Sequence, residues 1–243
     1  MPTSLPKYHR IILKLSGEAL AGGSGKIFDP GILKQLAREI KSVRTAGVEI
    51  GIVIGGGNIF RGAGSLGHSF DRVSADYMGM LATIINGLAL QVHLEQAEVP
   101  ARVQTAFPVQ VVAEPFSSRR AIRHFEQGCV VIFAGGTGNP YFTTDTAAVL
   151  RAVEIEADAI LKATQVDGVY SADPRTTPNA RRIAEISYQE VVARGLRVMD
   201  LTAITMAMEN RIPIAVFSLQ PEGNLLRVVM GEPIASWVTE KAE

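Results

Sequence analysis

Cysteine is almost absent from this chain of 243 residues, which contains only Cys129. A single cysteine cannot form an intrachain disulfide, and this composition is typical of a reducing compartment. Cys129 opens the apolar run 129–133, so we expect it to be buried in the core. The four histidines are scattered, with no cysteine or histidine cluster, and no metal site made by the protein alone is predicted.

An excess of charge is also missing, since 24 basic residues balance 24 acidic ones. Non-specific binding of nucleic acid needs a basic surface, so no nucleic-acid partner is expected. The segment 1–10 contains two prolines and no apolar stretch, unlike a secretory signal. The longest apolar stretch, 78–92, is interrupted by polar residues and is shorter than the roughly 20 residues of a membrane span. We therefore expect a cytoplasmic protein that does not bind membranes.

The apolar content of 47% is enough for a full core, and its distribution favours an α/β fold. Short apolar runs alternate with longer helical patterns, which is typical of parallel strands joined by crossover helices. Strands are predicted at 10–15, 48–54, 101–104, 129–134, 159–162 and 214–217. Helices are predicted at 30–46, 72–97, 117–127, 144–156, 200–210 and 222–230. The polar segment 167–184 is predicted to be a surface excursion.

We interpret residues 1–243 as a single domain with two lobes, whose boundary near Gly128 would let the flanking glycine-rich turns face one cleft. The helix predicted at 72–97 is apolar almost all round. This pattern indicates that the helix packs against its own core and another subunit at once. A homo-oligomer is therefore expected.

Three glycine-rich turns follow predicted strands, at 14–17, 55–58 and 135–140. Glycines let backbone N–H groups converge on an anion, and a following helix adds the positive end of its dipole. Three such turns indicate two phosphorylated ligands. The phosphate-loop pattern G-x-x-x-x-G-K-[ST] and the G-x-S-x-G elbow of serine hydrolases are both absent.

A G-x-G-x-x-G match occurs at Gly62, Gly64 and Gly67, beginning eight residues after the strand that ends at Ile54. The dinucleotide fingerprint needs its glycines directly at the turn from strand to helix. A dinucleotide-binding fold is therefore not favoured.

Charged residues at the ends of apolar runs are the candidates for chemistry. Lys14 ends an apolar strand, where a charge is costly unless paired, so it either forms a structural salt bridge or contacts a phosphoryl group in transfer. Lys162 repeats this arrangement on a second strand. Asp145 lies at a predicted helix start. Its role is either structural, complementing the helix dipole or capping the helix, or functional, orienting the lysines or holding Mg²⁺. Asp76 either caps the helix 72–97 or accepts hydrogen bonds from ribose hydroxyls.

Read together, five segments resemble the bacterial uridylate (UMP) kinases of the amino-acid kinase superfamily. These segments are 14–20, 54–62, 76–80, 136–145 and 162–170. The resemblance extends over about residues 9–240 and implies a three-layer α/β/α sandwich around a mostly parallel sheet. It also implies reversible phosphorylation of UMP to UDP by ATP, with Mg²⁺ bound to the ATP, in pyrimidine nucleotide biosynthesis.

The same resemblance assigns expected roles to individual residues. The catalytic residues would be Lys14, Asp145 and Lys162. The ATP phosphates would contact Lys14, Leu15, Ser16, Gly17, Gly57 and Arg61, and the adenosine would contact Thr164, Tyr170 and Asp173. UMP would be bound by Gly56, Asp76, Thr137, Gly138, Asn139, Pro140, Tyr141, Phe142, Thr143 and Thr144, with Asp76 on the ribose.

The resemblance further implies a homohexamer that UTP inhibits and that GTP activates in many bacteria. Here the segment 22–27 and the residues Gln91 and Glu95 depart from the pattern of GTP-responsive members, so weak or absent GTP activation is expected. One alternative is a kinase of the same superfamily for acetylglutamate, aspartate or carbamate, although the carboxylate of Asp76 would repel such acids. Another is a non-catalytic protein related to molybdate storage, which intact Lys14 and Asp145 disfavour.

Overall fold

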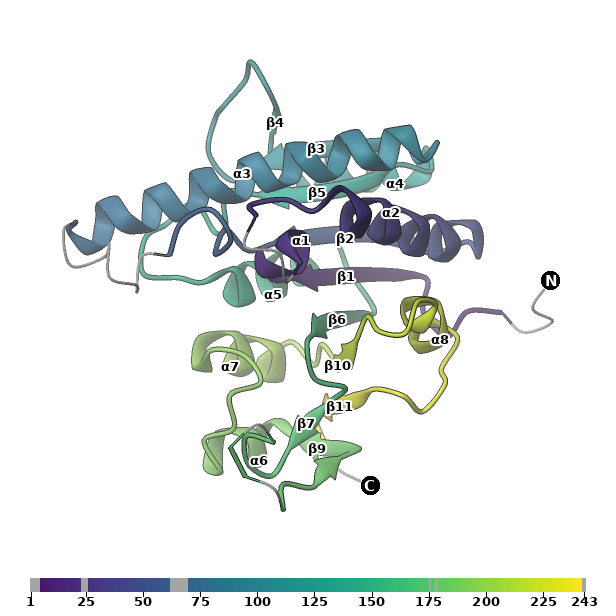
Figure 1. Ribbon diagram of the computed structural model, residues 1–243, viewed down its shortest axis with the longest axis vertical. Helices are drawn as coiled ribbons and strands as arrows, with labels where there is room; N and C mark the ends of the chain where they lie inside the picture. The colour runs from purple at the N-terminus through teal and green to yellow at the C-terminus, as the bar shows by residue number, and fades with distance from the viewer. Residues whose placement is uncertain (1–4, 23–25, 62–69, 175, 178, 242–243) are drawn as a thin grey trace.

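A nine-stranded sheet forms the centre of the computed structural model, which describes residues 5–22, 26–61, 70–174, 176–177 and 179–241 (Figure 1). The strand order is β4-β3-β5-β2-β1-β6-β10-β11-β9, and every neighbouring pair is parallel except β10 and β11. The strands are β1 (Arg10–Leu15), β2 (Glu49–Ile54), β3 (Ala101–Thr105), β4 (Glu114–Pro115), β5 (Val130–Ala134), β6 (Ala159–Thr164), β9 (Glu185–Ser187), β10 (Ile214–Ser218) and β11 (Ser236–Thr239). A separate antiparallel hairpin joins β7 (Val169–Tyr170) to β8 (Arg182–Ile183).

Helices cover both faces of the sheet, which confirms the predicted three-layer α/β/α arrangement. One face packs against α2 (Pro30–Thr45), α3 (Arg72–Gln96) and α8 (Asn224–Val229). The other packs against α4 (Ser118–Glu126), α5 (Thr144–Glu154), α6 (Tyr188–Ala193) and α7 (Leu201–Glu209). The short helix α1 (Glu18–Ala21) follows β1.

The predicted strands and helices all occur, with ends that differ by no more than two residues. The elements β4, β7, β8, β9, β11, α1 and α6 were not predicted. The hairpin β7–β8 lies within 167–184, the segment expected to be a surface excursion. Cys129 is buried, as expected. Gly62, Gly64 and Gly67 lie outside the described residues, as does part of the segment 22–27.

Alternation along the strands decides which side chains face which layer. In β1, Leu13 and Leu15 belong to the core on the α3 side, and Ile12 belongs to the core on the α5 side. Because successive side chains of a strand point to opposite faces, Lys14 lies on the same side as Ile12. The same rule applies to β6, where Ile160 packs on the α5 side and Lys162 follows it by two positions.

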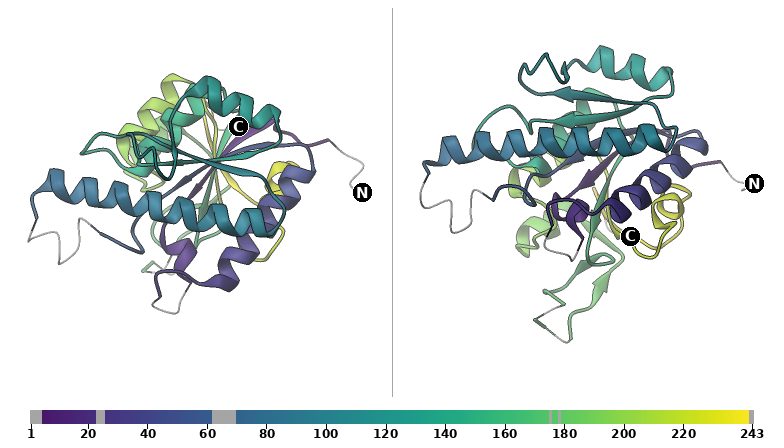
Figure 2. Two further views of the ribbon diagram at one scale, coloured as in Figure 1. Left: turned by 90° about the horizontal axis from the view of Figure 1, so that it is seen from above. Right: turned by 45° about the horizontal axis from the view of Figure 1, so that its top comes forward.

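The longest helix, α3, lies along one side of the sheet, and its N-terminal turns extend past the rest of the fold (Figures 1 and 2). It begins after Asp71, whose side chain accepts a hydrogen bond from the backbone N–H of Ser74 at 3.0 Å. Asp76 therefore does not cap this helix. By length and composition alone α3 could cross a membrane, a test that buried core helices also pass, and 44% of its most apolar window is buried in the structure.

Candidate active site

Lys14 and Lys162 are partners in the register of the parallel strands β1 and β6. Both lie at the carboxyl ends of their strands and on the side covered by α5. Asp145, in the first turn of α5, forms ion pairs with both: Lys14 Nζ lies 2.7 Å from Asp145 Oδ1, and Lys162 Nζ lies 2.8 Å from Asp145 Oδ2. The three predicted catalytic residues are thus brought together.

Burial and charge act in opposite directions on this cluster. Burial raises the pKa of Asp145, but the ammonium groups of Lys14 and Lys162 together outweigh it, so the pKa of the carboxyl lies below its ordinary value. Burial lowers the pKa of Lys162, and although the Asp145 carboxylate opposes this effect, burial and the nearby Lys14 together leave the pKa below its ordinary value. With two lysines and one aspartate, the cluster has an excess of basic side chains, which suits an anionic ligand.

Asp200, at the N-terminus of α7, connects this helix to the start of α5. Its carboxylate accepts hydrogen bonds from Thr143 Oγ1 at 2.5 Å and from Thr146 Oγ1 at 3.0 and 3.1 Å. It also caps α7 by accepting from the backbone N–H of Ala203 at 2.9 Å. Thr143 in turn caps α5 by accepting from the backbone N–H of Asp145 at 3.0 Å. The cap of α5 is therefore Thr143, and Asp145 is free to pair with the lysines.

The loop before α7 also holds one of the lysines. Lys162 Nζ donates to the backbone carbonyl of Val198 at 2.6 Å, just ahead of Asp200. These contacts form a closed ring. It runs from Lys162 to the segment 198–200, from Asp200 to the start of α5, and from Asp145 of α5 back to Lys162. Sequence reasoning missed Asp200, for which the start of the predicted helix 200–210 was the available signal.

The glycine-rich turns after β1 and β2 touch each other. A Cβ atom on Gly17 would lie 2.4 Å from Asn58 Oδ1 and 2.8 Å from the backbone nitrogen of Gly57, so no larger residue fits there. The two turns form one surface beside Lys14. That both turns contact phosphates stays a prediction.

Polar residues of α3 hold two of these turns in place. Asn86 is fully buried, and its Nδ2 donates to the carbonyl of Gly55 and to Asn58 Oδ1, both at 2.7 Å. Thr83 Oγ1 accepts from the backbone N–H of Gly135 at 2.7 Å. The sequence offered a signal for both residues, because each interrupts an otherwise apolar helix.

A cavity of about 270 Å³ lies between α3 and the turn that leads into α5. Five predicted UMP-binding residues line it: Gly56, Asp76, Phe142, Thr143 and Thr144. The other predicted residues, Thr137, Gly138, Asn139, Pro140 and Tyr141, belong to the adjoining turn and do not line it. Thr144 immediately precedes Asp145 in the sequence, although Asp145 and the two lysines do not themselves line the cavity.

Asp76 takes part in this cavity from the second turn of α3. Its Oδ2 accepts hydrogen bonds from Arg72 Nε at 2.8 Å and from the backbone N–H of Tyr141 at 2.7 Å. The side chain is only 17% exposed. A carboxylate in such a wall can accept hydrogen bonds from the hydroxyl groups of a ligand.

The comparisons with known proteins agree with this geometry. The amino acid kinase family model matches residues 9–218. The chain belongs to the amino acid kinase family. The crystal structure of UMP kinase from Bacillus anthracis is similar over 97% of both chains, with 41% identity and a TM-score of 0.93. That of UMP kinase from Ureaplasma parvum matches 96% of this chain and 100% of its own, with 36% identity and a TM-score of 0.90.

Within this amino acid kinase, most of the predicted ATP-binding residues lie at or just after the carboxyl ends of β1, β2 and β6. Arg61 is 65% exposed, and its Nη2 pairs with Glu18 Oε1 at 2.5 Å. The side chain of Leu15 is fully buried, so only its backbone could face a ligand. Thr164 donates to the carbonyl of Val166 at 2.5 Å, at the end of β6.

Two predicted adenosine contacts lie beyond the sheet. Tyr170 is in the hairpin β7–β8, and its hydroxyl donates to Asp167 Oδ1 at 2.7 Å. Asp173 is exposed in the loop that follows β7. Neither residue lines the cavity beside Asp76.

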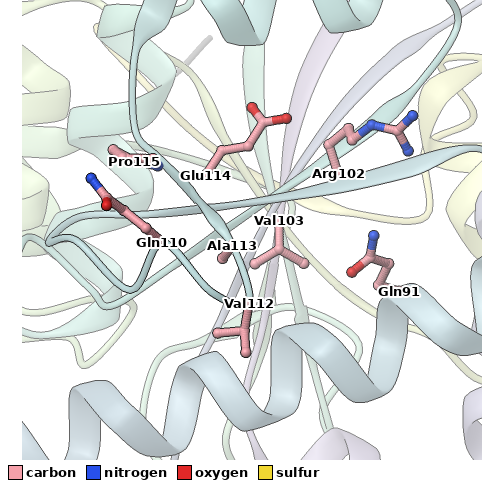
Figure 3. A pocket seen from close by; sticks show the side chains of 8 residues that line it. All are labelled: Gln91, Arg102, Val103, Gln110, Val112, Ala113, Glu114 and Pro115. Carbon is pink, nitrogen blue, oxygen red and sulfur yellow. The ribbon is translucent and has the colours of Figure 1, made fainter.

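A larger cavity of about 380 Å³ lies away from the lysine cluster, between α3 and the strands β3 and β4 (Figure 3). Gln91 enters it from α3, and Arg102 and Glu114 come from the strands. Its charged lining residues, Arg102 and Glu114, have opposite signs. Gln91 Nε2 also donates to Glu95 Oε1 at 3.2 Å. This cavity therefore lacks the excess of positive charge found at the lysine cluster.

Proposed function

We propose that this amino acid kinase transfers the γ-phosphoryl group of MgATP to UMP, reversibly forming UDP for pyrimidine nucleotide biosynthesis in the cytoplasm. The observation that carries the proposal is the pairing of Lys14 and Lys162 with Asp145 beside the cavity that Asp76 lines. The similarity over nearly the whole chain to two UMP kinases supports the choice of UMP.

Phosphoryl transfer between nucleotides needs positioning and charge neutralisation rather than a covalent intermediate. The accepting atom is a phosphate oxygen of UMP, which is largely ionised near pH 7, so no general base is required. Lys14 and Lys162 neutralise the negative charge that spreads over the transferred group. Asp145 holds the two ammonium groups apart at fixed positions, since each of its oxygens lies within 2.8 Å of one of them.

The acceptor would occupy the cavity between α3 and the start of α5. Its phosphate would lie near Thr144 at the N-terminus of α5, where the helix dipole favours an anion. Its ribose would lie near Asp76, whose carboxylate accepts hydroxyl hydrogen bonds. Residues 137–141 would close the cavity over the nucleotide.

The donor nucleotide would lie over the carboxyl ends of β1 and β6. The turns at 14–17 and 55–58 would face its phosphates, together with Arg61. Glu18 now pairs with Arg61, and the phosphates would have to compete with that exposed pair. Thr164, Tyr170 and Asp173 would contact the adenosine.

Magnesium fits this site through the nucleotide. Both oxygens of Asp145 face ammonium groups, and the described residues contain no group of three or more His, Cys, Asp or Glu side chains suited to a metal ion. Mg²⁺ is commonly held by substrate phosphates with few protein ligands, and it neutralises their charge when bound. We therefore infer that it enters with ATP.

We further propose a homohexamer inhibited by UTP, with weak or absent GTP activation. The outer face of α3 supports association, because it exposes the apolar side chains of Val73, Tyr77, Leu81, Ile85 and Val92. The cavity beside Gln91 supports a weak GTP response, since its opposed charges attract a triphosphate poorly. A division into two lobes near Gly128 stays a prediction, and the acceptor cavity draws residues from both sides of it.

The test is release of ADP from MgATP with UMP, CMP, dUMP, acetylglutamate and carbamate offered separately. Rapid turnover is expected with UMP. Turnover with acetylglutamate or carbamate alone would instead identify a small-acid kinase on the same fold. No turnover with any acceptor would favour the non-catalytic alternative.

A further inference from the structure

The carboxylate of Asp76 is held on one oxygen only. Arg72 Nε and the backbone N–H of Tyr141 both donate to Oδ2, at 2.8 and 2.7 Å. A carboxylate oxygen offers about two lone-pair positions, so these donors saturate Oδ2. Among the residues that the structure describes, none donates a hydrogen bond to Oδ1. This oxygen is therefore the one available to a ligand in the cavity.

Arg72 is poorly explained by the stability of α3. It lies in the first turn, where the positive end of the helix dipole disfavours a cation. It also precedes its acidic partner by four positions, which is the less favourable order for an ion pair along a helix. Its side chain is 58% exposed, and exposed pairs contribute little to stability.

Tyr141 is equally unexpected at its position. Its φ of 72° is in the left-handed region, which a tyrosine adopts only at a cost. The residue is 66% exposed, so burial does little to offset this cost. The guanidinium of Arg72 lies 5.4 Å from the centre of its ring, within the range of a cation–π contact. Arg72 thus contacts both Asp76 and the residue that donates to Asp76.

We infer that Arg72 is a positioning residue that determines sugar specificity. Arg72 and Tyr141 form a clamp that fixes Oδ2 of Asp76 and presents Oδ1 to the hydroxyl groups of the acceptor's sugar. Arg72 itself lines the acceptor cavity, so the clamp is part of the binding wall. The inference rests on the proposed function, because it requires a ribonucleotide acceptor. A deoxyribose offers one hydroxyl fewer, so the clamp favours UMP over dUMP.

The test compares UMP and dUMP kinetics in Arg72→Met. This variant keeps an unbranched side chain but removes the guanidinium group, and with it the contacts with Asp76 and with the ring of Tyr141. A lost hydrogen bond to a charged group corresponds to a change of about tenfold or more, so the KM for UMP should rise about tenfold. The KM for dUMP should rise less than that for UMP, because deoxyribose offers one hydroxyl fewer. The KM for ATP should change by less than about twofold, and kcat should be kept, because the clamp touches neither the lysine cluster nor ATP. Arg72→Lys should recover part of the selectivity, since it retains the charge but not the planar group.

Arg38→Met is the matched control. Arg38 has the same exposed fraction of 58% and a comparable ion pair with Glu222, but it does not line the cavity. It should keep the wild-type selectivity. Unchanged selectivity in folded Arg72→Met would overturn the inference while UMP turnover still supports the proposed function. A wild type inactive with UMP would overturn both.

Tyr141→Gly separates the clamp from a general role in folding. Glycine adopts a positive φ freely and keeps the N–H, so the melting temperature should not fall. Selectivity for UMP over dUMP should nevertheless decrease, because Arg72 loses its contact with the aromatic ring of Tyr141. Wild-type selectivity in this variant would contradict the clamp.

Discussion

Lys14 and Lys162 occupy paired positions on adjacent parallel strands, and both direct their ammonium groups to one carboxylate. Two like charges at such neighbouring buried positions would repel each other strongly without a counter-charge. Asp145 supplies that charge from a helix on the same side of the sheet. The three residues therefore act as one unit, and removal of any member affects the other two.

Lys14→Ala should lower turnover by two orders of magnitude or more. Deleting one electrostatic contact to a transition state costs about 2.7–4 kcal/mol, which corresponds to this loss. Steady-state assays with UMP and MgATP measure it. Lys41→Ala serves as the control, because Lys41 is exposed and pairs with Glu98, away from the lysine cluster. Near-normal turnover in Lys14→Ala would show that Lys14 has a purely structural role.

The activity should decline on the alkaline side with a midpoint below pH 10.5, the ordinary pKa of lysine. Burial and the nearby Lys14 lower the pKa of Lys162, so it loses its proton at a lower pH than in the unfolded chain. Between the folded pKa and 10.5 the unfolded chain binds more protons, so the free energy of unfolding should rise with pH there. The pH profile of kcat/KM for ATP reports this group in the free enzyme.

Lys162→Arg should remove that alkaline decline, since a guanidinium keeps its charge throughout the range. The absolute kcat/KM can be lower because the geometry changes. Lys41→Arg should keep the wild-type profile. An alkaline midpoint that is the same in the wild type and in Lys162→Arg would assign the decline to another group.

Asp200→Asn should reduce turnover about tenfold with smaller changes in both KM values. Asparagine caps a helix as well as aspartate does, so the start of α7 is preserved. The amide has only one acceptor oxygen, so the charge-assisted bonds to Thr143 and Thr146 weaken by about 1.5 kcal/mol. Asp29→Asn, which changes the cap of α2, is the control and should retain activity. Full activity in a folded Asp200→Asn protein would argue against a catalytic role for the contacts that link Asp200 to the start of α5.

The exposed face of α3 should be an interface between subunits. Leu81 and Ile85 are both 49% exposed, and Leu81→Glu combined with Ile85→Glu should reduce the assembly from a hexamer to smaller species in sedimentation velocity experiments. Val192→Glu is the control, because Val192 has a similar exposure of 42% on α6. A wild type that sediments as a monomer would contradict this prediction.

GTP should change turnover by less than about twofold at fixed UMP and MgATP. The cavity that contains Gln91 is lined by one cation, Arg102, and one carboxylate, Glu114, so the net attraction for a triphosphate is small. Initial rates over a range of GTP concentrations measure the response. A rise of several-fold would overturn the prediction.

The sequence was sufficient for the central strands because they are short, continuous apolar runs bounded by glycine or polar residues. It was insufficient for β9, β11 and the hairpin β7–β8, which contain two to four residues each and only a few apolar side chains. Local patterns cannot predict such segments, since their pairing depends on the rest of the sheet.

The candidate site shows the same division between local and distant information. Lys14, Lys162 and Asp145 could be singled out because each is a charge at the end of an apolar or helical segment. Asp200 accepts a hydrogen bond from Thr143, which is 57 positions away in the sequence, and Asp76 accepts one from Tyr141, which is 65 positions away. Such contacts follow from the packing of α7 and α3 and leave no local trace in the sequence.

Asn86 and Thr83 bind the turns at Gly55 and Gly135 to the inner side of α3, so any displacement of this helix would also displace both turns. A rigid helix cannot move on its outer side without moving on its inner side as well. In an assembly joined through Leu81 and Ile85, a shift of one subunit would therefore pull on the glycine turns of its neighbour. Mechanical communication between subunits would then require only a small translation of α3, with no hinge and no mobile loop.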